Sequence, residues 1–146
     1  MHTLHPFIVH FPIALLTLCL LFELLAWFAR TPTLSQVGWW MQLTGTLGVI
    51  ASVLSGVVAE ASGGIALLRA AETFAWHQQF AFGVSVIFAV LIFFRFSPQH
   101  TLPSSWPRLY LAALSVGVAL LLATGWLGGE LVFTYGVGIA SPSPSH

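Results

Sequence analysis

Four long blocks of apolar residues divide this chain, and each is long enough to cross a lipid bilayer as a helix. The hydrocarbon layer is ~30 Å thick, so a crossing helix needs roughly 20 apolar residues. The blocks cover residues 7–28, 37–59, 74–96 and 107–128. Only four Lys or Arg and four Asp or Glu occur among the 146 residues, which is too few for a surface exposed to water.

This pattern predicts an all-α fold, an integral membrane four-helix bundle in which consecutive spans run up and down. We expect residues 1–140 to form one four-span membrane domain, and residues 141–146 to be a disordered tail. The lipid bilayer is then the main partner of the protein.

The arginines predict how the bundle is oriented in the membrane. Arg30, Arg95 and Arg108 flank the two loops that join the first span to the second and the third to the fourth, whereas Arg69 lies on the other side. Basic residues near the ends of spans are retained on the cytoplasmic side. The distribution therefore predicts that both termini are outside, which for a bacterial inner membrane is the periplasm.

Charge and cysteine content exclude several classes of function. The formal net charge is zero and there is no basic stripe, so we expect no nucleic-acid partner. Cys19 is the only cysteine, which excludes an internal disulfide, a thiolate zinc cluster and a C-x-x-C-H site for covalent haem. The sequence also has no nucleotide-binding loop and no recognisable Ser-His-Asp arrangement, and it favours an electron-transfer or accessory protein over an enzyme.

Two histidines lie at matching depths in spans that run in the same direction. His10 and His77 each fall about one turn inside their spans, counted from the outer surface. At 1.5 Å per residue, both rings should lie ~5 Å below the outer start of the hydrocarbon. Haem iron accepts an imidazole on each axial face, and ionisable side chains inside membranes are costly and usually functional. The pair predicts a small b-type cytochrome that transfers electrons near the periplasmic face, with other membrane redox subunits or a second copy as partners.

Small residues occur at the level of these histidines. Ser55 and Gly56 lie near the outer end of the second span, and Gly125 and Gly129 near the outer end of the fourth. They would leave room for a flat macrocycle, and we expect them to contribute to a haem site. Membrane helices also use such residues to approach closely with no cofactor between them. The alternative is therefore a cofactor-free accessory subunit that packs on a larger membrane complex.

A metal site without haem is a further alternative. His5 precedes His10 by five residues, which places the two about 140° apart on an ideal helix. His77, Glu60 and Glu130 are expected at the level of His5. Imidazole and carboxylate are ligands for zinc, iron and copper. These residues leave open a metal-binding or transport protein.

Glu23 is the carboxylate that lies well inside a span. It precedes Arg30 by seven residues, or ~10 Å along the helix. We expect it to pair with Arg30 or with Arg95, since a charge inside a membrane needs a partner. A role in proton transfer is the alternative.

Both ends of the sequence resemble a known family. The opening HPFIVHFPIALL, residues 5–16, resembles the signature of a bacterial family of four-span membrane proteins catalogued as a domain of unknown function, number 2231. The segment GWLGGELVF, residues 125–133, is similar to the glycine-rich close of that family, and His77 falls where members carry a histidine.

The resemblance implies a four-span membrane protein and adds one qualification about the site. Glu60 stands where members often have Asp, and Tyr135 stands where many have His. If that C-terminal histidine is a ligand in the family, the corresponding site is altered or empty in this chain. Some members are fused to cytochrome-like domains, which implies redox partners.

Overall fold

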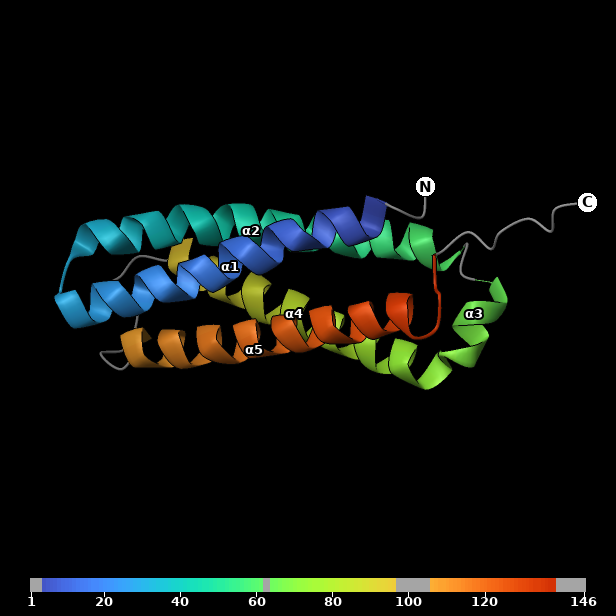
Figure 1. The fold of residues 1–146 in the computed structure, drawn as a ribbon. Coiled ribbons are helices and arrows are strands. Elements are labelled where there is room, and N and C mark those ends of the chain that lie inside the picture. Colours follow the sequence, from blue (N-terminus) through green and yellow to red (C-terminus); the bar gives the residue numbers. More distant parts are fainter. Residues whose placement is uncertain (1–3, 62–63, 97–105, 139–146) are drawn as a thin grey trace, which may run out of the picture.

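The computed structural model describes residues 4–61, 64–96 and 106–138, which are almost entirely helical. Four helices are long and apolar enough to cross a membrane, and they are connected as Figure 1 shows: α1 (Leu4–Ala29), α2 (Pro32–Glu60), α4 (Ala71–Phe96) and α5 (Trp106–Phe133). A short helix, α3 (Gly64–Arg69), lies between α2 and α4. The predicted all-α membrane fold with four spans is confirmed. The tail predicted at 141–146 lies outside the described residues.

The two ends of the bundle differ in their polar side chains. We call the end where α1 begins and α5 ends (Figure 1) the histidine end, because the helix bounds place His5 and His77 there. We call the opposite end the arginine end, because Arg30, Arg95 and Arg108 lie there. Which end faces the periplasm stays a prediction from the arginine count.

The bundle consists of two antiparallel hairpins, α1 with α2 and α4 with α5 (Figure 1). Small residues let the backbones approach, as is usual in membranes. A Cβ added at Gly45 of α2 would lie 2.7 Å from Cγ and Cδ2 of Leu16, which is closer than such atoms can approach. In the second hairpin, a Cβ at Gly117 would lie 3.2 Å from Phe88. Each hairpin is therefore tightly packed before the two meet.

The outer surface of the bundle is apolar. Large hydrophobic side chains point outward along the spans, including Phe133 at 89% exposed and Trp126 at 79%. In water such a surface would cause aggregation, whereas in a bilayer it faces lipid. The core between the helices is correspondingly narrow and is centred on Leu16, Phe88 and Leu114.

The packing of Gly45 predicts that this glycine cannot be replaced. We expect Gly45→Ala to destabilise the folded protein by about 1–3 kcal/mol, because the added methyl group meets the buried side chain of Leu16. Gly83→Ala is the matched control, since its Cβ would make an ordinary 3.9 Å contact with Leu120. Thermal loss of helical circular dichroism in detergent measures both. Equal stability of the two variants would show that α1 and α2 are farther apart than described.

Candidate functional site

Two imidazole rings from different hairpins lie against one another at the histidine end. His5 comes from the first turn of α1, and His77 from the second turn of α4. Their ring centroids are 6.5 Å apart and their planes are almost perpendicular, at 85°. Both side chains are half-buried. The ring that meets His77 thus belongs to His5, whereas the sequence had pointed to His10.

Hydrogen bonds hold both rings in one tautomer. Nδ1 of His77 lies 3.0 Å from the carbonyl oxygen of Thr124, which can only accept, so this nitrogen carries the proton. Nδ1 of His5 lies 2.9 Å from Oγ of Ser55, and that hydroxyl donates its own hydrogen to the Ser52 carbonyl at 3.0 Å. Nδ1 of His5 must therefore be the donor as well. In the neutral rings, both Nε2 atoms carry a free lone pair.

Two glycines make room for these rings. A Cβ added at Gly56 of α2 would lie 3.2 Å from Cε1 of His5, and one at Gly128 of α5 would lie 3.2 Å from Cε1 of His77. The helices beside the rings therefore approach them closely without a side chain in between. Each histidine is held by the second helix of its own hairpin.

Of the four small residues predicted for the site, the structure places two next to a histidine and two elsewhere. Ser55 and Gly56 contact His5. A Cβ added at Gly125 would instead lie 3.2 Å from Cδ1 of Ile13. A Cβ added at Gly129 would meet no atom of a neighbouring helix within 4 Å. Gly128, in the same motif, is the glycine of α5 that lies against His77.

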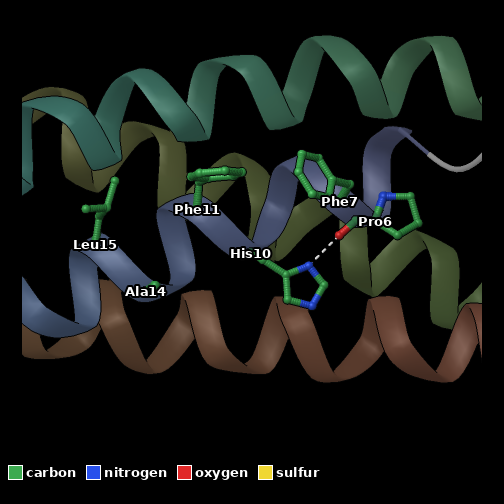
Figure 2. Close-up of a pocket in the computed structure, with 6 residues that line it drawn as sticks. All are labelled: Pro6, Phe7, His10, Phe11, Ala14 and Leu15. Carbon is green, nitrogen blue, oxygen red and sulfur yellow. Dashed lines mark hydrogen bonds between the residues drawn. The ribbon is translucent and has the colours of Figure 1, made fainter.

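His10 lies on another face of α1. It is exposed, and its Nδ1 donates a hydrogen bond to the Pro6 carbonyl of its own helix, which Figure 2 shows as a dashed line. The rest of its surroundings are apolar. The predicted pairing of His10 with His77 as haem ligands therefore stays a prediction that no contact in the described residues supports.

The predicted carboxylate ligands do not gather around the histidine pair. Glu60 is exposed at the end of α2, where its Oε2 accepts a hydrogen bond of 3.1 Å from Nε2 of Gln78. Glu130 and Tyr135 are half-buried near the end of α5. Within residues 4–61, 64–96 and 106–138, no group of three or more His, Cys, Asp or Glu is arranged to hold a metal. The structure thus collects two imidazoles rather than a cluster of ligands.

A second polar cluster lies at the arginine end. Glu23 and Arg95 form an ion pair, which confirms one of the two partners predicted for Glu23. Arg95 also donates to the Ser35 carbonyl at 2.8 Å, to Oε1 of Gln42 at 3.2 Å and to the Tyr110 hydroxyl. Tyr110 in turn donates to Oε1 of Gln42 at 2.8 Å. These residues come from α1, α2, α4 and α5, so one network links all four spans.

The sequence reading missed Gln42 and Tyr110, although a glutamine inside an apolar span is itself a signal of a polar contact. Gln42 is fully buried, and its Nε2 has no hydrogen-bond partner among the described residues. Gly38 makes room for the ion pair, since a Cβ there would lie 2.6 Å from Oε1 of Glu23. We interpret this network as structural, because its charges neutralise one another inside the bundle.

The family of the chain follows from a comparison with known proteins. The family model described as predicted membrane protein (DUF2231) matches residues 1–141. The chain belongs to this family. DUF2231 is a family of unknown function, so membership confirms the resemblance and the membrane fold and assigns no activity. No curated protein and no solved structure matches the chain.

For this DUF2231 member, the network at the arginine end predicts that two arginines contribute very differently to the stability of the protein. We expect Arg95→Met to destabilise the protein by about 3–5 kcal/mol, because it leaves the Glu23 carboxylate buried without a counter-charge. Arg108→Met is the matched control, since Arg108 is exposed and its loss should change stability by less than about 0.5 kcal/mol. Unfolding in mixed detergent micelles measures both. A similar effect of the two changes would contradict the network.

Proposed function

We propose that the protein is a small membrane electron-transfer subunit in which His5 and His77 would hold a haem b. One observation carries the proposal: two imidazoles from different hairpins lie 6.5 Å apart between ring centroids, at the same end of the bundle. The haem predicted from the sequence is kept, and His5 replaces His10 as the ligand from α1. With the three arginines at the other end, the positive-inside rule would put this haem near the periplasmic face.

The spacing of the rings suits an iron atom between them. When both Nε2 atoms point at the iron, two metal–nitrogen bonds of ~2.0 Å and two distances of ~1.1 Å from a ring nitrogen to its centroid add up to about 6.2 Å. The observed 6.5 Å is close to this value. A direct hydrogen bond between two ring nitrogens would bring the centroids to about 5.2 Å in the same collinear arrangement.

The hydrogen bonds of the rings also favour metal binding. Histidine ligands commonly donate their second ring N–H to a carbonyl or hydroxyl oxygen, which fixes the tautomer and the orientation of the ring. Thr124 and Ser55 play this part for His77 and His5. Both Nε2 atoms are therefore available as ligands without any rearrangement of protons.

The number of ligands favours haem over a simple metal ion. A zinc site usually takes three or four protein ligands, whereas haem iron receives four nitrogens from the macrocycle and needs two from the protein. Among the described residues, the histidine end brings His5 and His77 together without a third ligand beside them. When bound, the haem would supply one-electron chemistry, while Ser55 and Thr124 would orient the ligands, and Gly56 and Gly128 would let α2 and α5 pack against the rings.

The absorption spectrum of protein purified from cells supplied with a haem precursor tests the proposal. We expect a Soret band and, after reduction, the sharp α-band of low-spin haem. His5→Ala and His77→Ala should each abolish this low-spin spectrum, because each removes one axial ligand. His10→Ala, an exposed histidine on the same helix as His5, is the matched control and should keep the spectrum.

Two outcomes would contradict the assignment. Wild-type protein that is colourless although the cells were supplied with a haem precursor would contradict the haem proposal. Metal analysis of that protein would then test the alternative metal site. Loss of the spectrum in His10→Ala together with its retention in His5→Ala would instead restore the ligand pair predicted from the sequence.

The two adjacent glycines of α5 provide a finer test. Gly128→Ala should lower the affinity for haem, because its methyl group would press on Cε1 of His77 and turn the ring. Gly129→Ala should leave the affinity unchanged, since its methyl group meets no atom within 4 Å. Titration of haem into the apoprotein in detergent compares the two. If Gly129→Ala has the larger effect, the ring of His77 lies elsewhere.

A further inference from the structure

The two hairpins of the bundle repeat one another in register. A shift of 72 residues takes each buried residue of α4 to a buried residue of α1, and each buried residue of α2 to one of α5. The equivalent pairs in α1 and α4 are Pro12 and Val84, Leu16 and Phe88, and Cys19 and Leu91. The buried residues of α2 are Gly38, Gln42, Gly45, Thr46 and Val49, and their equivalents in α5 are Tyr110, Leu114, Gly117, Val118 and Leu121.

The closest contacts inside each hairpin repeat as well. Leu16 packs on Gly45 in the first hairpin, and Phe88 packs on Gly117 at the equivalent positions of the second. Most equivalent positions carry different residues, so the repeat lies in the packing of the helices more than in the composition of the sequence.

At the histidine end, the repeat extends to the same distances. A Cβ added at Gly56 would lie 3.2 Å from Cε1 and 3.6 Å from Nδ1 of His5. A Cβ added at Gly128 would lie 3.2 Å and 3.6 Å from the same two atoms of His77. The two glycines are equivalent positions, and so are the two histidines. Each hairpin therefore holds its own ring in the same way.

The helices are arranged as two units related by a two-fold rotation. α1 and α4 run in the same direction, and so do α2 and α5 (Figure 1). α1 packs beside α5, and α4 packs beside α2, as a rotation about the long axis of the bundle requires. Parallel repeats in membrane proteins are related by such an axis along the membrane normal. α1 and α4 thus face one another across the axis.

Residues on a two-fold axis meet their own equivalents. Two polar pairs of the bundle do so: His5 meets His77 at one end, and Glu23 meets Arg95 at the other. The histidines are alike, whereas Glu23 and Arg95 carry opposite charges. Two copies of the first hairpin would bring two glutamates together inside the membrane, and two copies of the second would bring two arginines together. Like charges repel strongly where water is absent.

We propose that the facing sides of α1 and α4 form an interaction surface between two units of one two-helix design, and that Glu23 and Arg95 make each unit select an unlike partner. The partner that fits the first hairpin is a unit of the same design with a basic residue in place of Glu23, which the second hairpin supplies. Attraction of unlike charges and repulsion of like charges give this selectivity. The histidine end then consists of two equivalent halves, whatever it binds.

An exchange of core residues in the full chain tests the repeat. We expect the double variant Leu16→Phe with Phe88→Leu to keep the midpoint of thermal unfolding in detergent within about 3 °C of wild type, because Gly45 gives a phenylalanine at position 16 the room that Gly117 gives Phe88. Phe88→Leu with Leu91→Phe is the matched control with the same composition. Its midpoint should fall by roughly 5–10 °C, because the equivalent of Leu91 is the smaller Cys19.

Reversal of the axial charges tests the selectivity. Glu23→Arg and Arg95→Glu should each lower the midpoint by roughly 10 °C or more, because each brings like charges together in the bundle. The two changes combined should recover at least half of this loss, since the opposite charges then meet again on the axis. Arg108→Glu, a reversal at an exposed position, is the control and should leave the midpoint unchanged.

Each experiment has an outcome that would overturn the proposal. A core exchange between positions 16 and 88 that lowers the midpoint as much as the exchange between 88 and 91 would show that the two hairpins are not equivalent. A doubly reversed variant no more stable than the single variants would show that Glu23 and Arg95 do not act as an exchangeable pair. Neither result depends on whether the protein binds haem.

Discussion

Inside a bilayer, a charged or amide side chain on a helix has no water to bond, so it needs a protein partner, and in this bundle Arg95 and Gln42 find theirs on other helices. This requirement joins the two hairpins of the bundle. Each hairpin is tightly packed on its own through glycines, whereas the apolar core and side-chain contacts at both ends connect one hairpin to the other. The ion pair of Glu23 with Arg95 does so at the arginine end, and the contact of His5 with His77 does so at the histidine end.

The two polar clusters have different chemical character. At the arginine end, the charges of Glu23 and Arg95 compensate one another, and Tyr110 and Ser35 fill most of the remaining hydrogen-bonding capacity. At the histidine end, each Nδ1 is satisfied but each Nε2 keeps a lone pair. A cluster whose charges are paired stabilises the fold, although Nε2 of Gln42 has no partner among the described residues, while a cluster with two free ligand atoms is suited to binding. This difference is why we place the proposed haem at the histidine end.

Hydropathy was sufficient to predict the helices but not the rotation of each helix about its own axis. The apolar blocks follow directly from the thickness of the bilayer, and all four predicted spans lie within observed helices. The partners of Arg95 depend instead on which sides of four helices face inward. Gln42 and Tyr110 are 68 residues apart in the chain, and nothing in either span alone indicates that they meet.

The spacing of residues along α1 explains which histidine faces inward. Pro12 and Cys19 are buried, and His5 precedes them at intervals of seven residues, so the three share one side of α1 to within ~20° per step. His10 lies roughly 160° from Pro12 on the same helix and points outward. The predicted pairing of His10 with His77 rested on depth in the membrane, and depth does not specify which side of the helix a residue occupies.

Electron paramagnetic resonance of the ferric, haem-loaded protein tests the central claim most directly, because the signal depends on the angle between the two axial imidazole planes. The rings of His5 and His77 are almost perpendicular, at 85°. The account predicts the highly anisotropic low-spin signal of perpendicular imidazoles, and its loss in His5→Ala. A rhombic low-spin signal, typical of parallel imidazole planes, that survives in His5→Ala would contradict it.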